Sequence, residues 1–362
     1  MGIARPQLGD EHMKTIPRQS PKLSPTPLPT SSSPNPSSGS SSTAMSATEA
    51  DRIPVATATL PTYELDQNGG PIIPPPPPRL MKDSFTMVLY YYTIFPLFLP
   101  LIKIFGNAKL PWKDLLLLFR IAFQARSKPV NGLPEFQNHQ LLKQLYQTAS
   151  AQHYVQQKSL EWQSSEGYCA PATVRCVLGS YPCIDKKSLP KQTFKESSPE
   201  NVCNLIHEII NDGAVTSTNS TDNSNDNDNT NVNMATEIIR GDTVTYDEFV
   251  STIRQATSGS SETKRIMLNF HRPPLFGTPK SPWSHPLSFI VYSVLAGHFS
   301  PILGLIENPS ENEGNNPLVG IWDVNHRYGG AYLVPAKRLY TSVTARDFWS
   351  GKSRALVVVT KL

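Results

Sequence analysis

Residues 163–178 read QSSEGYCAPATVRCVL, and this stretch decides how the second half of the chain is interpreted. A loop leads to Cys169, and Pro171 suits the first turn of a helix that runs to about Leu178. A cysteine at a helix N-terminus lies in the positive electrostatic potential of the helix dipole, which favours the thiolate and lowers the pKa of the thiol. Gln163 is placed to donate, with the backbone N–H of Cys169, to a developing oxyanion. A buried structural cysteine is the alternative interpretation.

Two later segments supply the partners that a cysteine nucleophile needs. GHFSP at 297–301 begins a predicted strand, and Asp323 follows the apolar run LVGIW. The turn-forming sequence NPSENEGNNPL lies between them, which predicts an antiparallel hairpin centred near residue 312. The midpoint of His298 and Asp323 falls at about 310.5, so the two side chains should approach each other across the ladder. Asp323 would then orient the imidazole, as in a nucleophilic triad. A structural core histidine beside an unrelated aspartate is the alternative.

The pattern of apolar residues predicts an α+β domain over residues 150–362. Helical spacing is present in LLKQLYQTASAQHYVQQ at 141–157 and in DTVTYDEFVSTIRQA at 242–256. The later runs RIMLNF, FIVYSVLAGHF, PILGLI, LVGIWDV, AYLV and ALVVVT are rich in β-branched and aromatic residues and are predicted strands. Helices first and strands later indicate the α+β class. Residues 212–235, which are dense in Asn, Asp, Ser and Thr, are a predicted solvent-exposed insertion.

The N-terminal part of the chain has a different composition. Residues 1–80 contain 16 of the 34 prolines and a Ser-rich run, so this region is predicted to be disordered. Residues 84–102, SFTMVLYYYTIFPLFLPLI, carry no charge and are long enough for a membrane-spanning helix. We therefore expect a membrane segment over 84–105 and a helical linker over 106–149. The alternative is an apolar helix packed on the domain. Flanking lysines favour a cytosolic side for the domain that follows.

Charge and cysteine usage exclude two classes of partner. The formal net charge of +4 is spread along the chain without a long Lys/Arg run, so no nucleic-acid interface is predicted. The four cysteines form no CxxC pair, so no zinc cluster is predicted and no residue is expected to be a metal ligand. The low cysteine content suits a reducing compartment such as the cytoplasm.

These segments together resemble the phytochelatin synthase family. QSSEGYCAPATVRCVL is similar to the family's Gln-Ser-x-x-x-Tyr/Phe-Cys-Gly stretch, and GHFSPILGL contains its Gly-His-Phe-Ser-Pro motif. WDV followed by VPAKRLY is similar to its aspartate strand, TVTYDEF to its Thr-Phe-x-x-Phe segment, and LNFHR at 268–272 to its Asn-Tyr-x-Arg strand. The similar segments follow the family's order from about residue 150 to 362, with insertions at 212–235 and around 275–296.

The resemblance implies a papain-like fold in which a helical part carries the cysteine and an antiparallel sheet carries the histidine and the aspartate. The implied catalytic residues are Cys169, His298, Asp323 and, in the oxyanion hole, Gln163. Ala170 stands where the family has Gly after the nucleophile, and catalysis needs only the backbone there.

The resemblance also implies residues that bind the substrate. In this family an Asp and an Arg just before the last strand hold the γ-glutamyl group, and Asp347 and Arg354 have the family's spacing. Arg272, the arginine of LNFHR, is a third candidate. Without the family, a surface ion pair is an equally good interpretation of Asp347 and Arg354.

The implied activity is that of a glutathione γ-glutamylcysteinyltransferase, which makes phytochelatins in heavy-metal detoxification. Glutathione is the expected partner, and heavy-metal ions such as Cd, Zn and Cu are expected as its thiolate complexes, so no bound cofactor is required. Hydrolysis of the same acyl-enzyme, which would make the protein a peptidase of glutathione or its conjugates, is the second hypothesis. A catalytically degenerate, membrane-tethered scaffold is the third, against which the intact set of Cys, His, Asp and Gln speaks.

Overall fold

The structure is a computed structural model that describes residues 65–67, 69–73, 99–100, 103, 108–193, 198–211, 233–258, 263–278, 282–308 and 316–362. All of these belong to one compact unit, Thr59–Leu362. The disorder expected over residues 1–64 and 74–80 concerns positions outside the described residues. The same holds for most of the apolar segment 84–105 and for residues 212–232 of the polar insertion.

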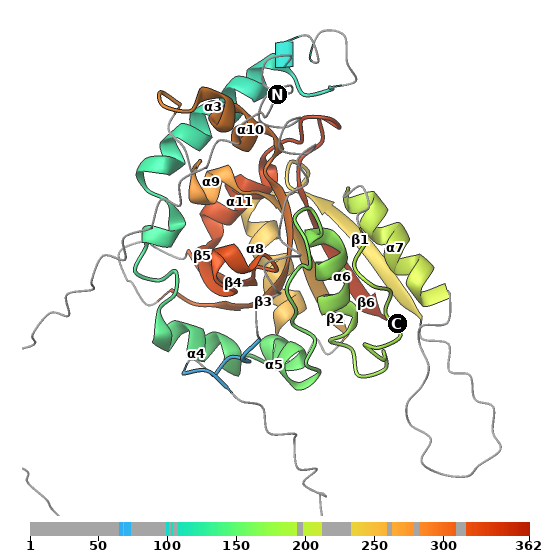
Figure 1. Cartoon of the computed structure of the whole chain (residues 1–362). Helices are drawn as coiled ribbons and strands as arrows, with labels where there is room; N and C mark the ends of the chain where they lie inside the picture. Colours follow the sequence, from blue (N-terminus) through green and yellow to red (C-terminus); the bar gives the residue numbers. More distant parts are fainter. Residues whose placement is uncertain are drawn as a thin grey trace, which may run out of the picture. The chain divides into compact units, whose positions relative to one another are not determined.

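The described part of the chain is an α+β unit built on one antiparallel sheet (Figure 1). The strand order is β1-β6-β2-β3-β4-β5, and every neighbouring pair is antiparallel. The strands are β1 (Met234–Arg240), β2 (Lys264–His271), β3 (Gly297–Ile306), β4 (Leu318–Trp322), β5 (Ala331–Pro335) and β6 (Ala355–Lys361).

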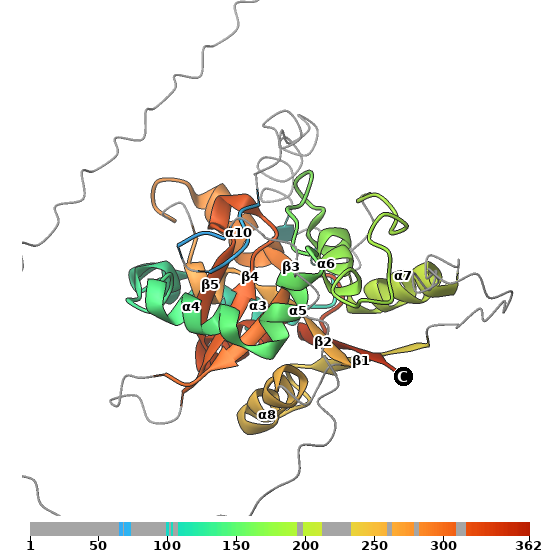
Figure 2. The same cartoon turned by 90° about the horizontal axis from the view of Figure 1, so that it is seen from below.

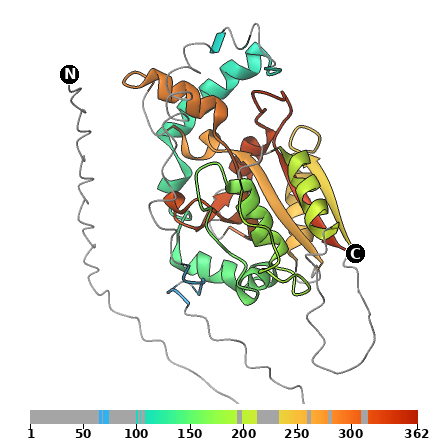
Figure 3. The ribbon, with the colours of Figure 1, turned by 45° about the vertical axis from the view of Figure 1, so that its right-hand side comes forward.

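Helices cover both faces of this sheet. They are α3 (Trp112–Ser127), α4 (His139–Gln147), α5 (Ala149–Gln156), α6 (Cys169–Leu178), α7 (Pro199–Asn211), α8 (Tyr246–Thr257), α9 (Pro273–Phe276), α10 (Pro286–Leu295) and α11 (Ala336–Thr344), with the short 3-10 turns η3 (Val130–Gly132) and η5 (His326–Tyr328). Figure 2 shows α8 on the opposite side of the sheet from α6 and α7. In Figure 3, α7 lies along β1 and β6 close to the C-terminus.

The alternation of side chains along the central strands divides the core into two layers. In β6, Val357 and Val359 pack in the cluster formed with α4 to α7, whereas Leu356 and Val358 pack in the cluster formed with α8 and α11. Because both faces are buried, ALVVVT is a continuous apolar run instead of an alternating one. The strands predicted from such runs are therefore found, with one exception.

The exception is FIVYSVLAGHF, for which the sequence predicts a single strand. Its first seven residues lie in α10, and β3 begins only at Gly297. Pro286 occupies the first position of α10, where a proline suits a helix. Val291 and Val294 are buried in a third apolar cluster with residues of α3. A short apolar run fits a buried helix as well as a strand, and tertiary packing decides here.

The boundaries of the domain also differ from those that the sequence predicts. The expected insertion 212–235 ends earlier, because Met234 and Ala235 already belong to β1, which pairs with β6 along its length. Residues 69–73 also depart from the expected disorder. The indole of Trp162 donates to the carbonyl of Ile73 at 3.1 Å. Gly70 is buried so close to the ring of Tyr146 that a Cβ there would lie 2.5 Å from it.

Residues 108–149 of the expected helical linker belong to the packed unit. The backbone N–H groups of Lys109 and Leu110 donate to the carbonyls of Trp349 and Phe348, at 3.2 and 3.3 Å. On the sheet, Leu145 of α4 is buried in the space that the glycines of β3 and β4 leave open. Among the helices that the structure describes, none is both long and apolar enough to cross a bilayer.

Candidate active site

The N-terminus of α6 presents Cys169, which is the first residue of that helix. Gly167 adopts a φ of 82°, a left-handed conformation that glycine accepts without strain, and the chain turns there into the helix. Most of α6 is buried against β2 and β3, including Ala170 and Pro171. The cysteine that the sequence singled out therefore stands at the positive end of a firmly packed helix dipole.

His298 and Asp323 lie next to each other through the hairpin that the sequence predicted. The antiparallel pairs between β3 and β4 include Ile302 with Ile321 and Gly304 with Gly320, which centres the ladder near residue 312. His298 is the second residue of β3, and Asp323 directly follows β4. The His298 Nε2 lies 2.8 Å from Asp323 Oδ1, and both side chains are buried.

Cys169 and His298 form the candidate reactive pair, since they are hydrogen-bonded and shift each other's pKa. Burial raises the pKa of the Cys169 thiol, but the charge of His298, hydrogen bonds from His298 and from the backbone of Phe299, and the charge of Arg272 together lower it below its usual value. Burial and Arg272 lower the pKa of His298, while Asp323 and Cys169 raise it, and the net shift is upward. Both shifts favour a thiolate–imidazolium pair. Because Nε2 contacts Asp323, Nδ1 is the nitrogen that remains for Cys169.

Asp323 is held in its ionised form by several donors. Arg272 Nη2 donates to both carboxylate oxygens at 3.0 and 3.2 Å, the hydroxyl of Tyr332 donates at 3.2 Å, and the backbone N–H of Asn325 donates at 2.9 Å. Burial raises the pKa of Asp323, but Arg272 and His298 hold it at about 2. Asp323 is therefore a permanent anion behind the imidazole.

Arg272 lies inside the site and contacts the orienting aspartate. Its guanidinium also stacks over the ring of Tyr328 at 3.7 Å. Burial lowers the pKa of Arg272 and Asp323 raises it, with a net upward shift. The sequence assigned Arg272 to substrate binding, and its pairing with Asp323 was missed. Asn325, two residues after an aspartate, was a readable turn signal, whereas nothing in the sequence indicated Tyr332 or Tyr328.

Gln163 lies beside the segment of Asp323. Its backbone N–H donates to the carbonyl of Val324, the residue after Asp323, at 2.7 Å. Its side-chain Nε2 approaches Glu166 at 3.4 Å, and the side chain is buried. Gln163 is thus tied to the residue after Asp323, and its side-chain amide points to Glu166.

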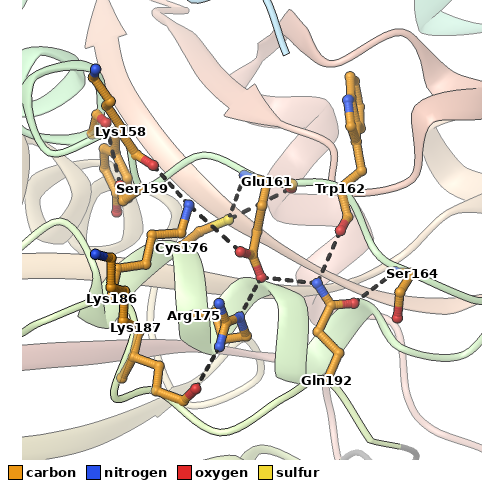
Figure 4. A network of polar contacts seen from close by, with 12 residues as sticks. Lys158, Ser159, Glu161, Trp162, Ser164, Arg175, Cys176, Lys186, Lys187 and Gln192 are labelled. Atoms are coloured by element: carbon orange, nitrogen blue, oxygen red, sulfur yellow. Dashed lines mark hydrogen bonds and ion pairs between the residues drawn. The ribbon is translucent and has the colours of Figure 1, made fainter. Parts of the chain in front are cut away.

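A polar network holds the segment before Gln163 against α6 (Figure 4). Arg175 and Gln192 donate to the carboxylate of Glu161 at 2.7 and 2.9 Å. Gln192 also donates to the carbonyl of Trp162 and accepts from the backbone N–H of Ser164, at 3.0 and 2.7 Å. The network fixes both neighbours of Gln163, which the sequence did not indicate because Gln192 comes from a distant loop.

Asp347 and Arg354 form a largely buried pair. Arg354 Nη2 lies 2.9 Å from Asp347 Oδ2, and Arg354 is only 7% exposed. A Cβ on Gly297 would lie 2.6 Å from both terminal nitrogens of Arg354. The guanidinium therefore lies against the residue before His298. Burial lowers the pKa of Arg354, whereas the charges of Asp347 and Cys169 raise it. This excludes the interpretation of a surface ion pair.

His271 lies next to this arginine and stays neutral. Its Nε2 lies 2.8 Å from the carbonyl of Ser293. Burial and the Arg354 charge lower the pKa of His271 to about 3. Within the described ranges, no group of three or more His, Cys, Asp or Glu side chains has the arrangement of a metal site.

Comparison with the known protein families gave no match, and comparison with curated proteins gave no significant match.

The electrostatics of the site predict how Cys169 reacts with pH. Because the thiol pKa is lowered, iodoacetamide should alkylate Cys169 with a midpoint below that of the glutathione thiol, whose unperturbed value is about 8.5. In His298→Ala, burial is no longer opposed by the imidazolium, so the midpoint should rise. The measurement is the alkylation rate of the Cys169 peptide against pH by mass spectrometry. A wild-type midpoint at or above that of glutathione would contradict the ion pair.

Proposed function

We propose that this chain is a cysteine-nucleophile acyltransferase of the phytochelatin synthase type, with a papain-like arrangement of its catalytic residues. The observation that carries the proposal is Cys169 at the N-terminus of α6, hydrogen-bonded to His298. Asp323 Oδ1 lies 2.8 Å from His298 Nε2 and orients the imidazole. A nucleophile, a base and an orienting anion in this relation are what acyl transfer through a thioester requires.

In the first half-reaction, the Cys169 thiolate attacks the carbonyl carbon of the Cys–Gly bond of glutathione. The imidazolium of His298 gives its proton to the glycine nitrogen as the C–N bond breaks. Glycine leaves, and a γ-glutamylcysteinyl thioester remains on Cys169. The backbone N–H of Cys169 and the Gln163 amide are the proposed oxyanion donors, and the neutral His298 is then the base for the second step.

In the second half-reaction, the amino group of another glutathione attacks the thioester. His298 accepts the proton from the attacking nitrogen, the C–S bond breaks, and the thiolate returns to Cys169. The product is a peptide with one more γ-Glu-Cys unit. Heavy-metal ions enter as thiolate complexes of the substrate, so the chemistry needs no metal held by the protein.

Arg354 and Asp347 are the proposed binding site for the γ-glutamyl end of the substrate. Support comes from the burial of Arg354, from its position against Gly297, and from its electrostatic interaction with Cys169. A guanidinium suits the α-carboxylate of the substrate, and Asp347 suits its ammonium group. The Asp347 carboxylate also accepts from the backbone N–H groups of Trp349 and Ser350, which fixes its direction.

The test is incubation of the purified full chain with glutathione and cadmium, followed by mass spectrometry of the peptides. Peptides longer than glutathione support the transferase. If γ-Glu-Cys and glycine are the only products, the protein is instead a peptidase, in which water attacks the thioester in place of the second amino group. No turnover of glutathione under any metal condition would exclude both.

Gly297→Ala should weaken substrate binding while leaving the reactive pair in place. The added methyl would displace the Arg354 guanidinium, so the KM for glutathione should rise about tenfold, the scale of one charged hydrogen bond. The matched control is Gly132→Ala, where a Cβ meets nothing within 4 Å. Steady-state kinetics give KM, and iodoacetamide labelling of Cys169 reports the reactive pair. An unchanged KM would remove Arg354 from the proposed binding site.

A further inference from the structure

Helix α3 presents an apolar stripe to solvent. Its buried face consists of Leu115, Leu118, Ala122 and Ala125, which pack on the unit. On another side of the helix, Trp112, Leu116 and Phe123 are 50%, 65% and 51% exposed. Their spacing of four and seven residues places them on one side of the helix, in line with the half-buried Phe119. Exposed large apolar side chains gathered in this way mark an interaction surface.

Basic side chains border this stripe. Lys113 and Arg120 are exposed and are seven residues apart, so they form a parallel row beside Trp112 and Leu116. Arg126 is exposed in the last turn. The one acidic residue of α3, Asp114, faces the protein, where its carboxylate lies 3.9 Å from Arg346. The exposed side of α3 therefore combines apolar and cationic groups.

The position of α3 in the chain adds a second argument. The uncharged sequence of 84–102 ends just before this helix. Leu99, within that sequence, is buried in the same apolar cluster as Leu115 and Leu118. The Nζ of Lys103 donates to the carbonyl of Ala108 at 2.8 Å. The end of the apolar sequence is thus attached to α3, which lies beside α10 on the outside of the unit (Figure 1).

We propose that the exposed side of α3 docks on an anionic lipid bilayer, with Trp112, Leu116 and Phe123 in the interface and Lys113 and Arg120 at the headgroups. Trp, Leu and Phe on one side of a helix with Lys and Arg beside them are the composition of a helix that lies in a membrane interface. The cationic row complements a negative lipid surface. A second copy of this protein would carry the same cations on this side of α3 and would be repelled by them. This proposal is independent of the enzymatic one.

The test is co-flotation of the purified full chain with vesicles of phosphatidylcholine alone or with added phosphatidylserine. The variant Trp112→Glu/Leu116→Glu/Phe123→Glu keeps residues 84–102 and should bind anionic vesicles at least about tenfold more weakly. Lys113→Gln/Arg120→Gln should lose roughly tenfold in binding to anionic vesicles only. The matched controls, Leu362→Glu and Lys187→Gln/Lys191→Gln, change exposed residues elsewhere and should bind as wild type.

A direct readout separates insertion at α3 from binding by the apolar sequence alone. Brominated lipids should quench wild-type tryptophan emission, and Trp112→Phe should lose much of that quenching. Unchanged flotation of the triple-Glu variant, or unchanged quenching in Trp112→Phe, overturns the proposal. A triple-Glu variant that becomes smaller in light scattering but floats as wild type would overturn it in favour of a contact between two copies.

Discussion

Cys169→Ala should lower the rate at which glutathione is converted to longer peptides by on the order of 10⁴-fold or more, because it removes the group that carries the acyl intermediate. The substitution removes one sulfur from a helix N-terminus that the sheet supports, so the variant should fold and its far-UV circular dichroism should match wild type. In wild type, intact-mass spectrometry after rapid quenching should find a γ-glutamylcysteinyl adduct, which Cys169→Ala lacks.

The matched control is Cys183→Ala. Cys183 is partly exposed and lies outside the site, so this variant should retain wild-type turnover and the adduct. Buried Cys176 accepts from the backbone N–H of Glu161 at 3.3 Å, and burial raises the pKa of its thiol, so it cannot replace the nucleophile. Turnover by Cys169→Ala within tenfold of wild type would refute the covalent mechanism.

Asp323→Asn should lower both activity and stability. We expect activity to fall by about 10³- to 10⁴-fold, the scale found when an orienting carboxylate becomes an amide. The free energy of unfolding should fall by about 3–5 kcal/mol, because the guanidinium of Arg272, whose side chain is only 13% exposed, loses its counter-ion. Activity is measured with glutathione and cadmium, and stability by urea unfolding. Asp247→Asn, at an exposed position of α8, is the control and should change neither.

The pH dependence of this stability loss has a definite sign. The folded-state pKa of Asp323 is about 2, below the unfolded value of about 3.9. The stabilisation is therefore complete above about pH 4 and is lost as the pH falls through 2. Asp323 also raises the pKa of His298, so the comparison is made in a His298→Ala background, where no imidazole titrates at this position. In that background the unfolding free energy lost on Asp323→Asn should be constant from pH 5 to 8 and shrink in strong acid, and a loss that grows on acidification would contradict this assignment.

A second substitution separates orientation from folding. Arg272→Gln in the Asp323→Asn background removes the unpaired charge, so the double variant should regain part of the lost stability. It should not regain activity, because the imidazole is still oriented by an amide. Recovery of activity together with stability would mean that Asp323 acts only through folding.

The sequence predicted the parts of this site that depend on local patterns. Cys169 before Pro171 indicated a helix start, and the turn-forming run between His298 and Asp323 placed the hairpin centre near residue 312, where the ladder has it. These inferences succeed because helix starts and antiparallel registers are set by residues close in the chain. The α+β class followed in the same way from the runs that form β2 to β6.

The sequence did not predict contacts that link distant segments. Arg272 and Asp323 are 51 residues apart, and Gln192 reaches the segment of Glu161 across 31 residues. Such pairs form only when the folded chain brings distant segments together, and no spacing of residues in the sequence indicates which ones will meet. The failure at α10 has another cause, since a short apolar run fits both periodicities and only its packing on α3 selects the helix.

The backbone hydrogen bonds from Lys109 and Leu110 to the 348–349 turn have a consequence for how this protein can be shortened. A fragment beginning at residue 150 would retain every proposed catalytic residue, yet it would expose Phe348 and the side of the sheet that Leu145 covers. The smallest independently folding form of the protein should therefore begin before residue 108. Expression of fragments starting at 104 and at 150, compared by solubility and thermal melting, would locate this limit.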